Sequence, residues 1–261
     1  MLKAVLFDID DTLMPDESAA NEALVATAAI AKQWHNMPPG DLKDAVRRIA
    51  RRVFRAHPIV AKYDGNFDIS SWEALCSSFE GEDDEMRVLR AWAPEYRREV
   101  WNEALAENGV ADPLLADQLS VLYPCERRAR YVPYPDVKPC LDSLRAGYRL
   151  GLVTNGPCDL QCAKLDASGL SGYFGAVAIS REAGVKKPDP RVFVFALGKL
   201  GVAATDSAFV GDTPRTDIAG ARAAGMRAVW LNRDSSPQPD GIVPDATIRS
   251  LDELQDTLAG L

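Results

Sequence analysis

Hydrophobic and polar positions follow two different rhythms along this chain of 261 residues. A short apolar run at 4–7 is followed at once by acidic residues, which predicts a strand over 3–7 that is buried on both faces and ends at a polar crevice. From Pro15 to about Pro133, apolar residues recur at helical spacing, and no stretch is convincing as a strand. The chain is therefore expected to open with one strand and to continue into a helical segment.

The helical segment contains expected helices at 21–33, 86–108 and 112–127. Asp112 and Pro113 give the last of these an N-cap and a proline in the first turn. Two apolar stripes at helical spacing predict further helices. The first stripe is Val46, Ile49, Val53 and Phe54, and the second is Ile69, Trp72, Leu75 and Phe79.

After Pro135 the pattern changes to a repeated alternation of helix and strand, which is typical of parallel strands joined by right-handed crossovers. The first strand joins the same sheet, because a single strand is not stable alone. This pattern predicts an α/β domain formed by 1–14 and 134–261, with an all-helical insertion at 15–133 placed to act as a lid. The expected strands are 149–154, 176–180, 207–210 and 227–231, and the expected helices are 137–146, 160–168, one that opens at Asp189-Pro190, 214–224 and 251–258.

Charge and composition narrow the classes of partner. The formal net charge of −8 argues against general nucleic-acid binding, which needs a basic surface, and favours small molecules. No apolar run approaches the length that spans a bilayer, so we expect no membrane partner. The first residues show no cleavage site, which predicts no signal peptide. The five cysteines are irregularly spaced without a CxxC pair, so free thiols in a reducing cytoplasm are expected.

The acidic residues after the first strand are the first candidates for chemistry. Asp8, Asp10 and Asp11 repel one another, and a divalent cation among them is the usual solution. Asp8 and Asp10 share one face of an extended chain, so Asp8 can attack a substrate while Asp10 handles a proton. The alternative is a metal-free acidic turn that caps the strand.

Two later strand ends carry groups that suit an anion. Thr154, Asn155 and Gly156 place a hydroxyl and backbone amides after the second expected strand, although the same residues also form ordinary loops. Pro188 forces Lys187 into an extended conformation near another strand end, where its charge can neutralise a phosphoryl group. The alternative for Lys187 is a solvent-exposed lysine before a helix.

A fourth strand end adds two more carboxylates. Asp212, in the turn after 207–210, can complete the oxygen shell of a cation, and Asp217 can stand behind it. A first-turn acid that satisfies the helix dipole is the alternative for Asp217. Parallel strands bring all four ends to one edge of one sheet. Together these residues supply a nucleophile, an acid/base, a hydroxyl, a cation and metal-binding carboxylates, which are the parts that phosphoryl transfer requires.

With these motifs in this order, the sequence resembles the haloacid dehalogenase-like superfamily of hydrolases, in the branch with a helical cap after the first strand. The resemblance covers 1–14 and 134–235 strongly, and the cap by its position and helical character. It implies a Rossmann-like parallel-sheet core with an inserted all-helical cap domain. The motifs are Asp8-Ile9-Asp10-Asp11-Thr12, Thr154-Asn155-Gly156, Lys187-Pro188-Asp189-Pro190, and Gly211-Asp212 followed by Asp217.

The resemblance implies a Mg²⁺-dependent phosphatase that passes through an aspartyl-phosphate. Asp8 would attack phosphorus, and Asp10 would protonate the leaving oxygen and later activate water. True dehalogenases of this superfamily lack an acid at the position of Asp10, and a leaving alkoxide needs a proton, so Asp10 favours phosphoester hydrolysis. Many members have Gly at the position of Asp11, and the Asp-Asp-Thr-Leu sequence found here is more similar to the nucleotidase and acylneuraminate-phosphatase branch. The expected substrate is a nucleotide or sugar phosphate.

The resemblance also implies the roles of the other motif residues. Thr154 and the backbone amide of Asn155 would hold phosphoryl oxygens while Lys187 balances their charge. The expected Mg²⁺ ligands are Asp8, the carbonyl of Asp10 and Asp212, with Asp217 outside that shell.

Other functions remain open on this scaffold, because a fold does not fix its chemistry. The enzyme alternatives are a phosphomutase and a 2-haloacid dehalogenase, and the alternative from another class is a catalytically idle binding protein. The cap should choose the substrate, and we expect a monomer or a homodimer. A row of arginines opposite the first apolar stripe can meet a second anionic group of a substrate or form a solvated face. The row consists of Arg47, Arg48, Arg51, Arg52 and Arg55.

Overall fold

The computed structural model describes residues 1–35, 38–63 and 69–261. The chain divides into two compact units. Unit 1 consists of Met1–Pro15, Val132–Gly156 and Ser168–Leu261, and unit 2 consists of Asp16–Tyr131 and Pro157–Ala167. The expected boundaries of the cap domain, 15–133, stay a prediction. Segment 157–167, expected within the α/β domain, packs with the helical residues instead.

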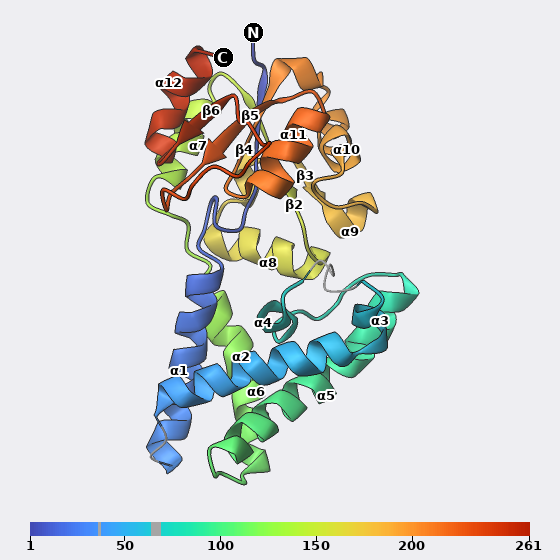
Figure 1. Ribbon diagram of the computed structural model, residues 1–261, viewed down its shortest axis with the longest axis vertical. Helices are drawn as coiled ribbons and strands as arrows, with labels where there is room; N and C mark the ends of the chain where they lie inside the picture. Colours follow the sequence, from blue (N-terminus) through green and yellow to red (C-terminus); the bar gives the residue numbers. More distant parts are fainter. Residues whose placement is uncertain (36–37, 64–68) are drawn as a thin grey trace. The chain divides into compact units, whose positions relative to one another are not determined.

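Unit 1 is built on a parallel sheet, which confirms the predicted α/β fold (Figure 1). Within the described residues the strand order is β3-β2-β1-β4-β5-β6, and every neighbouring pair is parallel. The order reverses at β1, so the carboxyl end of β1 lies at the topological switch point where such sheets bind ligands. The strands are β1 (Ala4–Phe7), β2 (Arg149–Thr154), β3 (Ala176–Ile179), β4 (Ser207–Gly211), β5 (Arg227–Leu231) and β6 (Ala246–Ile248).

Helices cover both faces of this sheet. On one face, Phe193 of α10 packs edge-on against Phe209 of β4, with ring centroids 4.9 Å apart. On the other face, α7 and α12 contact each other (Figure 1). The Asp189 carboxylate accepts from Arg191 N at 2.9 Å and caps α10, as the Asp-Pro pair predicts. The helices of unit 1 are α7 (Val137–Leu144), α9 (Ser180–Ala183), α10 (Pro190–Leu200), α11 (Ala219–Ala223) and α12 (Leu254–Ala259), and a π-helical turn, Pro214–Ile218, precedes α11.

Every regular element in the described part of unit 2 is a helix. Helix α1 packs on α2 and α6, and α5 packs on the same two helices. Three residues of the arginine row pair with acids on neighbouring helices: Arg47 with Glu17, Arg48 with Glu107 and Arg52 with Glu103. The helices are α1 (Glu17–His35), α2 (Pro39–Ala56), α3 (Pro58–Ala61), α4 (Ser71–Ala74), α5 (Asp84–Glu107), α6 (Pro113–Arg128) and α8 (Cys158–Ser168).

The helix expected from the second apolar stripe is much shorter than predicted. Helix α4 ends at Ala74, and Phe79 has a φ of 52° in the left-handed region, although its ring is buried as the stripe requires. Side chains replace the helical hydrogen bonds here, because the Ser77 hydroxyl accepts from Phe79 N and Asp159 accepts from Ser78 N. Hydrogen bonds to side chains, one nearby and one distant in sequence, therefore replace the helix that the apolar spacing predicts.

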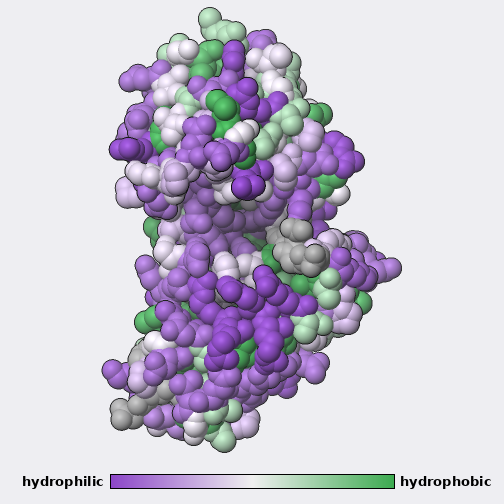
Figure 2. Space-filling model, viewed as in Figure 1, coloured by the Kyte–Doolittle hydropathy of each residue, from purple (hydrophilic) through white to green (hydrophobic). Residues whose placement is uncertain are grey.

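Within the described residues, no helix is both long and apolar enough to cross a membrane. On the face shown in Figure 2, hydrophilic residues predominate and hydrophobic residues are scattered among them. This distribution fits the charged fraction of the sequence, 26%.

Candidate active site

The end of β1 places Asp8 at the carboxyl edge of the sheet. Asp8 N donates to Val210 O at 3.0 Å, which extends the pairing of β1 with β4 by one residue. The chain then turns tightly: Leu13 N donates to Ile9 O at 2.8 Å, and Asp11 has a φ of 54°. This turn holds the acidic loop over the strand end and leaves Asp8 largely buried, at 8% exposure.

Lys187 lies within ion-pair distance of two of the predicted acids. Its Nζ is 2.7 Å from Asp8 Oδ1 and 2.8 Å from Asp217 Oδ1. Asn155 fixes the backbone of this lysine, because its Oδ1 accepts from Lys187 N at 2.9 Å and its Nδ2 donates to Lys187 O at 3.3 Å. Lys187 is therefore a buried cation, and the alternative of a solvent-exposed lysine is wrong.

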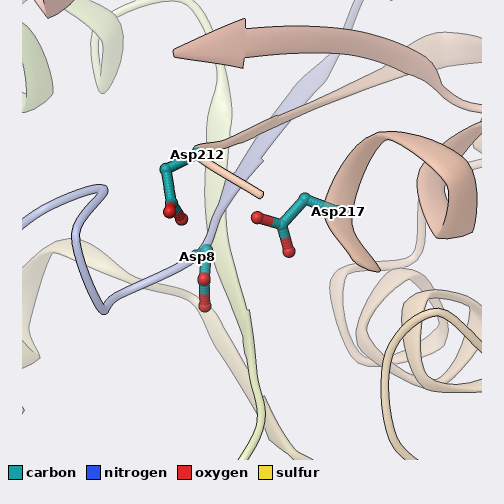
Figure 3. A group of neighbouring side chains, drawn as sticks. All are labelled: Asp8, Asp212 and Asp217. Atoms are coloured by element: carbon teal, nitrogen blue, oxygen red, sulfur yellow. The ribbon is translucent and has the colours of Figure 1, made fainter. Parts of the chain in front are cut away.

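Asp212 and Asp217 complete the acidic cluster with Asp8. One carboxylate oxygen from each of the three residues lies within 4.8 Å of the others. Figure 3 shows the side chains converging from three segments: the end of β1, the turn after β4 and the helical turn that follows it. Asp217 is fully buried and accepts from Thr213 N at 3.0 Å, and a Cβ on Gly211 would overlap its carboxylate. The glycine is required for this close approach.

The electrostatics of the cluster are unbalanced. Burial raises the pKa of Asp8 to about 6, with Lys187 lowering it and Asp217 raising it. Burial also raises the pKa of Asp212, and the charges of Asp217 and Asp8 raise it further, to about 8. Burial lowers the pKa of Lys187, but Asp217 and Asp8 raise it more, so this lysine stays charged. The carboxylates therefore carry more negative charge than one lysine neutralises.

The donor set fits a hard divalent cation. When all three carboxylates are ionised, as metal binding requires, Asp8, Asp212, Asp217 and the Lys187 ammonium together carry a charge of −2. Carboxylate oxygens are the ligands that Mg²⁺ prefers, and a divalent cation would balance this charge. Lys187 pairs with both Asp8 and Asp217, but Asp217 is fully buried and also accepts from Thr213 N, so Asp8 and Asp212 are the carboxylates most available to a metal.

Other predicted site residues lie at neighbouring positions of the same edge. Thr154 is the last residue of β2, beside β1, and its side chain is buried. Asp10 lies in the loop after β1, is half-buried, and forms an isolated β-bridge with Met14 through its backbone. The structure thus brings Asp8, Lys187 and the two later acids into contact and places Thr154 and Asp10 around them, while their individual roles stay predictions.

Sequence reasoning missed the residues that orient Asp212. Thr12 Oγ1 donates to Asp212 Oδ1 at 3.2 Å, and Thr213 Oγ1 donates to Asp212 Oδ2 at 3.0 Å. Trp230 Nε1, near the end of β5, donates to Asp212 O at 2.8 Å. Thr12 belongs to the first motif, so its position near the site could have been predicted from the sequence. Nothing in the position of Trp230 along the chain indicates its bond to Asp212 O.

Comparisons with known proteins agree with this geometry. A family profile of haloacid dehalogenase-like hydrolases matches residues 2–225. Phosphoserine phosphatase from Thermus thermophilus is 38% identical over 256 residues, which cover 97% of this chain and 98% of that protein. Glyceraldehyde 3-phosphate phosphatase from Methanopyrus kandleri is 32% identical over 269 residues, which cover 100% of this chain and 99% of that protein. The crystal structure of a 2-haloacid dehalogenase from Pseudomonas syringae pv. Tomato is similar with a TM-score of 0.62 at 29% identity, covering 100% of this chain and 99% of that one.

Proposed function

Because the chain belongs to the haloacid dehalogenase-like hydrolase family, we propose that it is a Mg²⁺-dependent phosphatase that hydrolyses small phosphomonoesters. The observation that carries the proposal is the buried contact of Asp8 with Lys187 beside Asp212 and Asp217. One edge of the sheet then holds a carboxylate nucleophile, a cation that balances the phosphoryl charge, and further carboxylates that can bind a metal.

In the proposed reaction, Asp8 attacks phosphorus while the ester P–O bond breaks. Asp10 donates a proton to the leaving oxygen, so an alcohol leaves and a phosphoryl group stays on Asp8. Asp10 then takes a proton from water, the water attacks phosphorus, and the bond to Asp8 breaks to release inorganic phosphate. Lys187, the Thr154 hydroxyl and the backbone amide of Asn155 hold the phosphoryl oxygens throughout.

We propose Asp8, the carbonyl of Asp10 and Asp212 as the Mg²⁺ ligands, with Asp217 holding Lys187 beside them. The bound ion would add positive charge where the phosphoryl oxygens gather. The raised pKa of Asp212 agrees with this assignment, because it reflects burial and then the negative charges of Asp217 and Asp8, which a cation would balance.

The substrate class is a small phosphate ester. The two relatives that align along nearly their whole length are named for phosphoserine and glyceraldehyde 3-phosphate. Both are three-carbon phosphate esters, so these esters join nucleotides and sugar phosphates as candidates. The role of the helical insertion as a substrate-selecting lid remains part of this proposal.

Phosphate release from a panel of such esters, with Mg²⁺ and with EDTA, tests the proposal. We expect Mg²⁺-dependent release that Asp8→Asn abolishes, because the amide is a poor nucleophile. Asp240→Asn, the same change at an exposed position of unit 1, is the matched control and should keep full activity. Circular dichroism of both variants verifies that the fold is intact. Activity retained in Asp8→Asn would contradict the mechanism.

The similarity to a 2-haloacid dehalogenase makes halide release the second reaction to measure. The candidate acid Asp10 argues against it, since a departing halide needs no proton. Halide release from a 2-haloacid without phosphate release from any ester would replace the proposed function with this one.

A further inference from the structure

Arg233 lies next to the site, in the loop after β5, and forms a bidentate ion pair with Asp136. Its Nη1 is 2.8 Å from Asp136 Oδ2, and its Nη2 is 3.1 Å from Asp136 Oδ1. The guanidinium stacks on the Tyr134 ring, 4.0 Å from the centroid. The pair is mostly removed from solvent, with side-chain exposures of 18% and 10%. Such a planar pair fixes orientation as well as charge.

The same guanidinium reaches the acidic loop after β1. Arg233 Nη2 also donates to Thr12 O at 3.0 Å, and the hydroxyl of Thr12 donates to Asp212 Oδ1. Arg233 therefore holds the backbone of Thr12, and the side chain of the same residue binds Asp212. Asp136, Arg233, Thr12 and Asp212 are linked in that order, with the covalent frame of Thr12 between the last two hydrogen bonds. Arg233, Tyr134 and Asp212 also line one hollow of about 280 Å³ in unit 1.

Asp136 is itself held firmly, which makes it a fixed anchor. Its Oδ2 accepts from Ser250 Oγ at 3.0 Å and from Leu251 N at 2.9 Å, in addition to Arg233. Asp136 also lies just after Val132, where the chain re-enters unit 1. The loop that carries Thr12 is thus tied to the C-terminal part of unit 1 through one arginine.

We infer that Arg233 is a positioning residue for the metal ligand Asp212, acting through Thr12, and that Asp136 anchors it. The inference rests on the proposed function, because it assumes that Asp212 binds Mg²⁺. Hydrogen bonds to a ligating carboxylate set its direction, and losing such a partner typically costs about 10- to 100-fold in metal affinity. Arg233 contacts neither substrate nor metal in this role.

The experiment measures Mg²⁺ binding by titration calorimetry and the Mg²⁺ concentration for half-maximal phosphate release. Arg233→Lys keeps the charge but loses the planar fork that bonds Asp136 and Thr12 together. We expect its Mg²⁺ dissociation constant to rise about 10-fold, with kcat unchanged at saturating Mg²⁺. Arg227→Lys is the control, because Arg227 pairs with Asp245 at the opposite end of β5, and its affinity should match the wild type.

Variants of Thr12 keep the test decisive if Arg233→Lys folds poorly. Thr12→Val removes the hydroxyl and should weaken Mg²⁺ binding to a similar degree, whereas Thr12→Ser should restore it. Arg233→Lys combined with Thr12→Val should bind Mg²⁺ about as well as the weaker single variant, because both act on one chain of bonds. Fully additive losses would contradict a shared route.

A purely structural Arg233 would lower the unfolding temperature and leave the Mg²⁺ dissociation constant unchanged, and this result would overturn the inference. Calorimetry needs no ester, so the two proposals are separable. If the wild type binds Mg²⁺ but hydrolyses nothing, the proposed function fails while the affinities of the variants still decide the inference. If the wild type binds no Mg²⁺, the inference is overturned.

Discussion

Lys187 is the residue on which the electrostatics of the site depend. It pairs with Asp8 and Asp217 at once, and its side chain is almost fully buried. A buried cation with two carboxylate partners cannot be removed without leaving uncompensated charge. It therefore has a structural role in the absence of substrate and a catalytic role in the proposed reaction.

We predict that Lys187→Met lowers phosphate release by about 10²- to 10³-fold, the usual loss when one group that stabilises transition-state charge is removed. The free energy of unfolding at pH 7 should also fall, by about 3 to 5 kcal/mol, because two buried carboxylates lose their partner. Steady-state kinetics and urea unfolding measure the two effects. The control is Lys138→Met at an exposed position of α7 in unit 1, which should change neither quantity substantially.

The candidate site could be predicted to the extent that strand ends define it. Asp8, Lys187 and Asp212 follow strands or precede a helix at positions that the sequence makes visible, and parallel pairing brings those positions together. Thr12 and Arg233 act through hydrogen bonds between residues 221 positions apart. No spacing rule predicts such a contact, because it depends on how the loops pack.

At the scale of elements, α8 shows how a buried ionic cluster decides packing. Lys164 of α8 lies 3.1 Å from Asp16 Oδ1 and 2.8 Å from Glu73 Oε1. Arg127 of α6 pairs with the same Asp16, and both basic side chains are almost fully buried. At the other end of α8, Asp159 accepts from the hydroxyls of Ser77 and Ser78. These polar contacts hold α8 in unit 2.

Asp16 gives this cluster a testable pH dependence. Burial alone would raise the pKa of Asp16, but Lys164 and Arg127 lower it below its ordinary value. A lowered pKa adds stability at neutral pH, and this contribution is lost as the pH falls through the folded pKa. We predict that Asp16→Asn lowers the free energy of unfolding by about 3 kcal/mol at pH 7, and that its difference from the wild type narrows below about pH 4.

Urea unfolding at pH 7, 5 and 3.5 measures that difference. Glu103→Gln is the control, since its pair with Arg52 is exposed and should contribute at most about 1 kcal/mol. A deficit in Asp16→Asn that stays constant down to pH 3.5 would show that the charge of Asp16 is not the cause.

Periodicity predicted the long elements well and the short ones poorly. Helices α5 and α6 continue through Pro94 and Pro124, as their apolar pattern indicated. Strand β6, Ala246–Ile248, was not predicted, because three residues carry too little pattern to stand out. The stretch around Phe79 failed for a different reason: its serines bond to Asp159, which lies 80 positions later in the chain. A hydrogen bond to a side chain so distant in sequence cannot be predicted from the local pattern of hydrophobic and polar residues.

At the scale of the whole molecule, the sequence predicted the order of elements but not the membership of α8. The chain passes between the units after Pro15, Tyr131, Gly156 and Ala167, so unit 2 is completed by a segment that lies beyond its main stretch. The expected monomer or homodimer and the cytoplasmic location stay predictions. Completion by α8 has a direct consequence for folding.

We predict that residues 16–131, expressed alone, do not unfold cooperatively. Asp16 and Glu73 would lose Lys164, so the two carboxylates would share one cation, Arg127, and the serines near Phe79 would lose their acceptor Asp159. The same fragment joined through a Gly/Ser linker to residues 157–168 should show a cooperative thermal transition by circular dichroism.

Lys164→Met in the joined fragment separates the ion pairs from the added length. If the contacts of Lys164 are what complete unit 2, this variant should behave like the fragment without α8, because the carboxylates of Asp16 and Glu73 again lack their lysine. If fragment 16–131 instead unfolds cooperatively at the same temperature as the joined fragment, the helices of 16–131 are stable without α8. The contacts of Lys164 are then not needed for the stability of unit 2.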